Sequence, residues 1–118
     1  MKEKQIKTIR INLSEKEGTL STFFYKIRGS KKHSEISKLR NLLSNEKVRL
    51  LCICKIKQPE SIYKLAKLLG RDFKAVRHDV KFLEELGLIE LVTSYKKKRE
   101  RLRPIIETDE IVIHINLS

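Results

Sequence analysis

The chain has 118 residues, of which 40% are hydrophobic, and this is enough for one compact domain with a modest core. It carries 27 Lys and Arg against 15 Asp and Glu, which gives a formal net charge of +12 at pH 7. This excess says nothing about fold, but it favours a polyanionic partner, either a nucleic acid or an anionic membrane surface. The simpler alternative is a soluble protein that happens to be basic. No apolar run approaches the roughly 18 residues that span a membrane, and the N-terminus lacks the apolar run of a signal peptide, so we expect a cytoplasmic protein without membrane contact.

The sequence shows no pattern of side chains typical of an enzyme or a metal site. It has no nucleophile beside a base, no paired carboxylates in a cleft context and no Gly-rich phosphate loop. Cys52 and Cys54 are two apart in a predicted helix, so they point to different faces and a mutual disulfide is not expected. His33, His78 and His114 are scattered and complete no zinc site with them. We therefore predict no enzyme activity, no metal and no cofactor, and we interpret both cysteines as small core residues.

Each end of the chain carries a segment that alternates apolar and polar residues, which is typical of a half-buried strand. In residues 6–13 the alternating apolar positions are Ile9, Ile11 and Leu13. In the C-terminal segment they are Ile111, Ile113, Ile115 and Leu117. Because a lone strand cannot satisfy its backbone groups, we expect these two strands to pair, either within one chain or between two.

Apolar residues at helical spacing, bounded by capping residues, predict five helices between the two strands. They cover residues 14–28, 34–43, 44–57, 61–69 and 72–86. Ser or Asp residues are suited to cap their N-termini, and glycines end three of them. The capping residues are Ser14, Ser44, Ser61 and Asp72, and the terminating glycines are Gly29, Gly70 and Gly87. The residues expected to face the core are Ile36, Leu39, Leu42 and Leu43; Val48, Leu51, Cys52 and Ile56; Ile62, Leu65, Leu68 and Leu69; and Phe73, Val76, Val80, Leu83 and Leu86.

After the last helix the pattern changes to a strand pair with a basic tip. Residues 88–92 are rich in β-forming side chains, residues 95–103 are almost solidly basic, and residues 105–106 follow Pro104 as a return strand. A short helix, a tight turn at Gly70, a longer helix and such a strand pair form the layout of a winged helix-turn-helix. The predicted fold class is therefore α+β: a winged helix-turn-helix with an added N-terminal strand and helix and a C-terminal strand.

Three short motifs stand out in and after this region: Leu-Gly-Arg-Asp at residues 69–72, Leu-Glu-Glu-Leu-Gly-Leu at 83–88 and Asp-Glu-Ile at 109–111. Together with these motifs, the sequence of residues 61–90 resembles that of the prokaryotic winged-helix transcriptional regulators. This broad group includes the arsenic-repressor and multiple-antibiotic-resistance-repressor types. In particular it is similar to a group of small archaeal DNA-binding regulators. The resemblance covers about residues 44–115. It implies a winged-helix fold and binding to double-stranded DNA, and it indicates no particular operator.

The longer helix carries cations on the face opposite its apolar stripe. These residues are Lys74, Arg77, His78 and Lys81. A helix with a basic exposed face can enter the DNA major groove. There Arg77 could donate two hydrogen bonds to the edge of a guanine, and Lys74 and Lys81 could reach phosphates. His78 could do either. The alternative is an ordinary solvated face, in which the nearby carboxylates of Asp79 and Glu84 pair with these cations.

The second basic element, about residues 93–106, is predicted to be the wing of the fold. Its cationic residues are Lys96, Lys97, Lys98, Arg99, Arg101 and Arg103, offset only by Glu100. Six cations on a short flexible loop suit phosphate contact or insertion into the minor groove, whereas a solvated charged loop is the alternative. Tyr95 could donate a hydrogen bond to a phosphate or simply pack on the strand. Ser61 could likewise donate to a phosphate, or only cap its helix.

We divide the chain into an N-terminal strand–helix extension, residues 1–33, and a winged-helix DNA-binding domain with the C-terminal strand, residues 34–118. The extension is expected to add a strand to the wing sheet. We also expect it to help form a contact between two subunits, because regulators of this fold bind near-palindromic sites as dimers. The candidate interface is its apolar stripe, unless that stripe is buried within the same chain; it consists of Leu20, Phe23, Phe24 and Ile27.

Taken together, these patterns predict a homodimeric DNA-binding transcriptional regulator. Its recognition helix, at about residues 72–86, would lie in the major groove, and its wing would lie on phosphates or in the minor groove. Two alternatives use the same fold: a protein-interaction module of a transcription or assembly complex, and a binder of structured RNA. Protein contacts lack the steep salt dependence of counterion release, and RNA binding would follow RNA shape.

Overall fold

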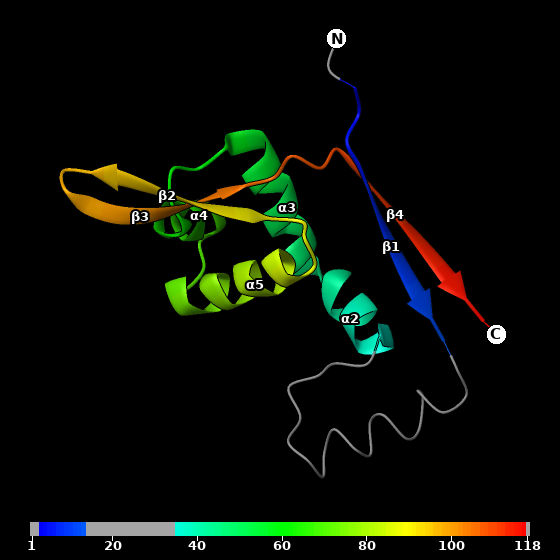
Figure 1. Ribbon diagram of the computed structural model, residues 1–118. Coiled ribbons are helices and arrows are strands. Elements are labelled where there is room, and N and C mark those ends of the chain that lie inside the picture. Colours follow the sequence, from blue (N-terminus) through cyan, green and yellow to red (C-terminus); the bar gives the residue numbers. More distant parts are fainter. Residues whose placement is uncertain (1–2, 14–34, 118) are drawn as a thin grey trace. The chain divides into compact units, whose positions relative to one another are not determined.

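The computed structural model describes residues 3–13 and 35–117 (Figure 1). Its elements are the strand β1 (Ile6–Asn12), the helices α2 (Glu35–Leu42), α3 (Asn45–Lys57), α4 (Ile62–Leu69) and α5 (Phe73–Glu85), and the strands β2 (Glu90–Lys96), β3 (Arg99–Ile105) and β4 (Glu110–Asn116). The predicted helix over residues 14–28, with its apolar stripe, lies outside the described residues. Among the described helices, none combines the length and the apolar content needed to cross a membrane.

The described residues form two compact units, one of residues 3–13 and 35–44 with 109–117 and one of residues 45–108. The first holds α2 and the strand pair β1–β4, and the second holds α3, α4, α5 and the hairpin β2–β3. Three helices followed by an antiparallel hairpin form the winged-helix arrangement, so the predicted α+β class is confirmed. The C-terminal strand belongs to the first unit because it pairs with the N-terminal strand.

The caps that the sequence predicts for α4 and α5 are present. The Ser61 hydroxyl accepts a hydrogen bond from the Lys64 N–H (3.0 Å), and the Asp72 carboxylate accepts one from the Ala75 N–H (3.3 Å). Each bond satisfies one of the N–H groups that helix geometry leaves unpaired. Gly70 follows α4 with a φ of 64°, a left-handed conformation that glycine adopts without steric cost. The turn between the two helices is therefore encoded by residues next to it.

The core of the second unit lies where its three helices meet. The buried side chains come from all three helices and from the segment that leads into β2. They are Leu50, Cys54, Ile62, Leu65, Ala66, Leu69, Val76, Val80, Leu83, Leu88 and Ile89. The predicted inward faces of α4 and α5 supply six of them, namely Ile62, Leu65, Leu69, Val76, Val80 and Leu83. These two helices are therefore oriented much as their apolar spacing indicates.

For α3, three of the predicted core positions are wrong. Val48 and Ile56 are 44% and 73% exposed, and Cys52 is exposed as well. Leu50 and Cys54, four residues apart on one side of the helix, are buried instead. The helix has an unbroken apolar run around these positions, so spacing alone could not indicate which side faces the core.

Three further residues that the sequence assigns to the core are exposed. Leu43, Leu68 and Phe73 are 57%, 39% and 39% exposed, respectively. Each stands at or next to the end of a helix. The apolar spacing continues to the helix end, but the neighbouring helices do not cover the side chains there. Phe73 is the first residue of α5.

The hairpin β2–β3 is joined by a two-residue turn, with Lys96 beside Arg99 and Glu90 beside Ile105. Lys97 and Lys98 form this turn with φ angles of 52° and 66°. Positive φ at both positions marks a type I′ turn, whose twist suits a hairpin but which normally selects Asn and Gly. The basic segment is therefore not the flexible loop that the sequence suggested. Most of its cations lie on strands, where alternation fixes the side of the sheet to which each points.

The strands β1 and β4, from opposite ends of the sequence, pair in parallel (Figure 1). Ile9 lies beside Ile113 and Ile11 beside Ile115, so isoleucines of both strands share one face, on which Ile11 is buried. The pairing is within one chain, which decides between the two alternatives. The expectation that the N-terminal strand extends the wing sheet is wrong, because matching apolar faces favour its pairing with β4.

Candidate nucleic-acid interface

The four basic residues predicted for the recognition helix lie exposed on α5. They are Lys74, Arg77, His78 and Lys81, hereafter the α5 stripe. Spacings of three and four residues put them along one side of the helix, whereas Val76, Val80 and Leu83 on the other side are fully buried. His78 is largely exposed, with 87% of its side chain accessible to solvent. The helix therefore presents a row of positive groups that its own packing does not cover.

A buried carboxylate holds α5 from the side that faces the core. Asp79 is 8% exposed, and its oxygens lie 2.9 Å from Arg71 Nη2 and 3.6 Å from Lys47 Nζ. Lys47 belongs to α3 and Arg71 to the turn before α5, so this ion cluster joins three parts of the unit. The alternative was that Asp79 pairs with the basic residues of the α5 stripe. Of these residues, only His78 comes near it, with Nδ1 at 3.9 Å from an Asp79 oxygen. A carboxylate between two largely buried cations stabilises the fold only while all three groups are present.

A second contact from α3 holds the end of α4. The Arg49 guanidinium donates a hydrogen bond to the Leu69 carbonyl (3.1 Å), which is one of the carbonyls that a helix end leaves without an intrahelical partner. Lys47, two residues before this arginine in α3, also lies over the Phe82 ring, 5.2 Å from its centroid. The helix α3 thus contacts both helices of the motif through polar groups, and this fixes the orientation of α5.

The register of the hairpin sorts the wing cations by face. Opposed residues share a face, so the face that carries Lys96 and Arg99 also carries Arg101 opposite Ser94 and Arg103 opposite Val92. Tyr95 and Glu100 are on the other face, and Lys97 and Lys98 form the tip. Four of the six cations predicted for the wing therefore project on the same side of the sheet.

The residue before Ser61 is tied to this cationic face. A Glu60 carboxylate oxygen lies 3.6 Å from Lys96 Nζ and 3.9 Å from Arg101 Nη1. The carboxylate is 70% exposed, so the two ion pairs contribute little to stability. They do show that the cationic face of the wing and the start of α4 are neighbours.

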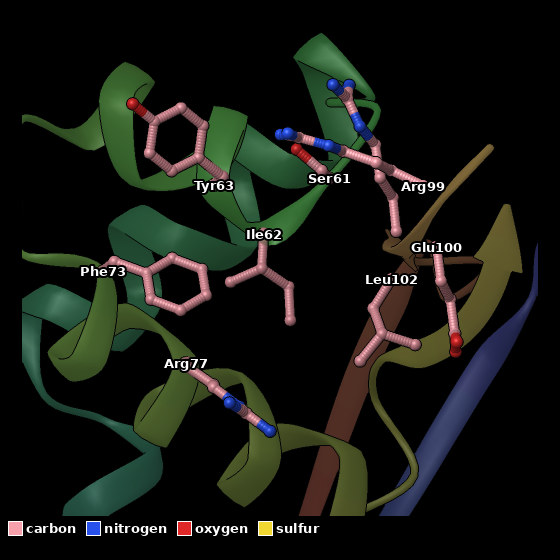
Figure 2. Close-up of a pocket in the computed structure, with 9 residues that line it drawn as sticks. Ser61, Ile62, Tyr63, Phe73, Arg77, Arg99, Glu100 and Leu102 are labelled. Atoms are coloured by element: carbon pink, nitrogen blue, oxygen red, sulfur yellow. The ribbon is translucent and has the colours of Figure 1, made fainter. Parts of the chain in front are cut away.

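A cleft of about 570 Å³ lies between the start of α4, the first turns of α5 and the strand β3 (Figure 2). It is lined by Ser61, Ile62, Tyr63, Phe73, Arg77, Arg99, Glu100, Arg101 and Leu102. Figure 2 shows Arg77 entering from the helix and Arg99 from the wing, with Ile62 and Leu102 between them. Apolar side chains thus form the middle of the cleft, and three arginines against one glutamate stand around it. Such a surface suits an anionic ligand with apolar edges, of which a nucleic acid is the commonest example.

Two aromatic residues of the cleft were missed by the sequence analysis. Tyr63 is 58% exposed and its ring centroid is 6.4 Å from that of Phe73, while Lys67 Nζ lies 4.9 Å from the Tyr63 ring. Exposed rings beside cations offer apolar or stacking contact to a nucleotide. Tyr63 could have been found, because it lies off the apolar stripe of α4. Phe73 could not, because it stands three residues before Val76 and so continues the buried stripe of α5.

The two residues predicted to contact the phosphate backbone have different positions. Ser61 lines the cleft and is 7% exposed. Its oxygen accepts the capping bond, and that role leaves the hydroxyl proton available for donation. Tyr95 is 73% exposed and is not among the residues that line the cleft. The structure therefore places Ser61 in the same cleft as Arg77, Arg99 and Arg101. Tyr95 lies outside this cleft.

The two cysteines of α3 have different environments. Burial raises the pKa of the Cys54 thiol from 9.0 to about 11, and its S–H donates to the Pro104 carbonyl (3.7 Å) at the base of the wing. The prediction that it fills the core is confirmed, whereas Cys52 is exposed. In the part of the chain that the structure describes, no cluster of His, Cys, Asp and Glu could hold a metal ion.

A protein-family model described as HVO_A0114 matches residues 42–113, which is more than half of the chain. The chain belongs to the HVO_A0114 family. The matched range runs from the last residue of α2 into β4, so the family model covers the residues of the cleft, the α5 stripe and the whole hairpin. Among curated proteins, none matches the sequence.

Proposed function

We propose that this member of the HVO_A0114 family is a sequence-specific DNA-binding transcriptional regulator that acts as a homodimer in the cytoplasm. The observation that carries this proposal is the cleft, in which Arg77 of α5 and the arginines 99 and 101 of β3 surround an apolar middle. A net charge of +12 supplies long-range attraction to a polyanion. The resemblance of residues 61–90 to archaeal winged-helix regulators supports the same function.

In this proposal the α5 stripe lies in the DNA major groove, which is wide enough to admit one α-helix. Arg77 is the residue best placed to bind a base edge, because a guanidinium can donate two hydrogen bonds to guanine. Lys74 and Lys81 reach phosphates on either side, and His78 contacts a base or a phosphate. The ion cluster of Asp79 supports base reading, since discrimination between bases requires a helix held in a fixed orientation.

The wing and the start of α4 contact the DNA backbone in this proposal. Lys97 and Lys98 at the tip of the hairpin reach phosphates or the minor groove. Ser61 donates to a phosphate at the N-terminus of α4, where the helix dipole favours an anion. Phe73, at the start of α5, offers an apolar contact of the kind that reads the methyl group of thymine.

The test is a selection from a random-sequence duplex pool at two salt concentrations. We expect an inverted repeat to be enriched by the wild-type protein. Arg77→Ala should abolish enrichment at one position of each half-site, at a cost of about 1–3 kcal/mol for the preferred base. Lys97→Ala should weaken binding to all sequences alike and lower the slope of log K against log salt by about 1. Lys57→Ala removes an exposed cation that does not line the cleft and serves as the matched control.

Three other outcomes would contradict the proposal. Salt-sensitive binding without enrichment would indicate a non-specific or architectural DNA binder. Stronger binding to structured RNA than to any duplex DNA would indicate an RNA-binding protein. Absence of binding near physiological salt would leave a protein-interaction module as the better explanation of the basic cleft.

A further inference from the structure

The outer edge of β4 is the feature that the proposed DNA contact does not use. The Leu13 N–H donates to the Asn116 carbonyl (2.8 Å), and the Glu110 N–H donates to the Gln5 carbonyl (3.2 Å). In a parallel ladder, alternate residues of each strand turn both backbone groups to the neighbour and the remaining residues turn them away. These bonds and the register therefore direct the backbone groups of residues 112 and 114 toward β1. Those of Ile111, Ile113 and Ile115 are directed to the outer side, where no described strand pairs with them.

The two outer edges of this sheet differ in how they are protected. β1 carries Lys7 and Arg10, and charged side chains on an edge strand discourage pairing with another chain. β4 has no Lys or Arg between Glu110 and Asn116, and four of its seven residues are Ile or Val. A two-stranded sheet is at best marginally stable alone, so an unprotected, strongly β-forming edge is suited to receive another strand.

We propose that a second copy of this chain pairs with the outer edge of β4, antiparallel and about a two-fold axis at Ile113. The product is a four-stranded sheet in the order β1, β4, β4 and β1, with a self-complementary contact as two-fold symmetry requires. Ile111 then exchanges backbone hydrogen bonds with Ile115 of the partner subunit. Val112 lies opposite His114 of the partner subunit, in a pair whose side chains are close. This inference gives the proposed homodimer its interface, and its test uses no DNA, so it can fail or succeed independently of DNA binding.

The opposed pair of Val112 and His114 allows a charge test that spares the core. Within one chain Val112 lies beside Thr8 and His114 beside Arg10, on the face of the sheet away from the buried Ile11. In V112E/H114E each glutamate faces one glutamate of the other subunit, and the two-fold axis produces this repulsive pair twice, while the carboxylate introduced by H114E gains Arg10 within its own chain. In V112K/H114E the same positions attract each other between subunits. The second variant is therefore the matched control for the first.

Sedimentation equilibrium of the full chain without DNA measures the outcome. We expect the wild type and V112K/H114E to be dimers, and V112E/H114E to dissociate with a dissociation constant raised by about tenfold or more. A monomeric wild type would overturn the proposal. So would a V112E/H114E protein that dimerises as tightly as the wild type, because a different surface would then hold the subunits together.

Amide hydrogen exchange followed by NMR tests the edge directly. In the dimer the amides of Ile111, Ile113 and Ile115 should exchange slowly, as those of Val112 and His114 do through β1. In V112E/H114E the three isoleucine amides should exchange fast, at least about tenfold faster, while residues 112 and 114 stay protected and show that the chain is folded. Slow exchange at the isoleucines in a monomeric protein would overturn the proposal, since the edge would then be covered by the same chain.

Discussion

The helix α5 and the hairpin β2–β3 both present rows of cations, but they are constrained to different degrees. α5 is held by Val76 and Val80 in the core and by the buried Asp79 cluster, which joins it to α3. The hairpin is anchored at its base, where Pro104 is buried, and ends in an exposed tip of Lys97 and Lys98. Positive charge is therefore presented with a fixed geometry on α5 and with a looser geometry on the hairpin. Base edges can be told apart only by fixed donors, whereas phosphates accept any nearby cation.

The largest expected effect comes from releasing α5. Asp79→Ala leaves Arg71 and Lys47 without their shared carboxylate, and we expect the free energy of unfolding to fall by about 3 kcal/mol. Urea denaturation of the variant measures this loss. Glu84→Ala, on the exposed side of the same helix, should change stability by less than about 0.5 kcal/mol. Equal effects of the two substitutions would mean that the ion cluster does not hold the helix.

The second effect concerns geometry at constant charge. Arg77→Lys keeps the positive charge but loses the planar fork, so we expect discrimination between the preferred and other bases to fall by about 1–3 kcal/mol. Arg99→Lys on the wing should leave both affinity and discrimination nearly unchanged. Competition binding with cognate and scrambled duplexes measures both. Loss of discrimination with Arg99→Lys, and none with Arg77→Lys, would reverse the roles of the two regions.

The third effect separates stability from affinity in the wing. Replacing Lys97 by Asn and Lys98 by Gly puts the residues that a type I′ turn prefers at φ angles of 52° and 66°. We expect the double variant K97N/K98G to be more stable by about 1 kcal/mol, since left-handed conformations are costly for other residues. It should nevertheless bind DNA more weakly, with a lower salt slope, because two cations are gone. Thermal unfolding and salt titration check the two parts, and a variant less stable than the wild type would contradict the first.

The smallest effect at neutral pH involves the base of the wing. The thiol of Cys54 is neutral when protonated, and its pKa is raised from 9.0 to about 11 in the folded protein. Its contribution to stability is therefore complete below pH 9 and is lost as pH rises toward 11, where the unfolded state releases the proton first. Urea denaturation between pH 7 and pH 11 should show this decline. Cys54→Ala should make the fall in the free energy of unfolding between pH 9 and pH 11 smaller, whereas Cys52→Ala should leave it unchanged.

The sequence predicts those parts of the fold that depend on neighbouring residues. Ser61, Gly70 and Asp72 define the turn between α4 and α5, because caps and left-handed glycines act within a few residues. The apolar spacing of α5 likewise indicates which side of the helix carries its cations. These local signals are sufficient to place Arg77 on an exposed helix face.

Features that depend on distant residues could not be predicted. Asp79 resembled a surface carboxylate, because nothing near it in the sequence shows that Lys47 and Arg71 enclose it. The wing strands were predicted, but their extent through the basic segment was not, because a run of Lys and Arg has no apolar alternation to reveal it. Pairing of the two terminal strands was expected, but alternation does not specify a partner sheet or a parallel direction.

The pairing of β1 with β4 also has a consequence for the order in which the molecule assembles. Gln5 and Asp109, joined by a hydrogen bond at the start of this pair, are separated by 104 positions in the sequence. Contacts of such long range form slowly, because bringing the two ends together costs conformational entropy of the intervening chain. The helices and hairpin of residues 45–108 are joined by contacts of shorter range, such as that of Cys54 with Pro104, which are 50 positions apart, so they can fold before β1 pairs with β4. We therefore expect the strand pair to form after the helices and the hairpin.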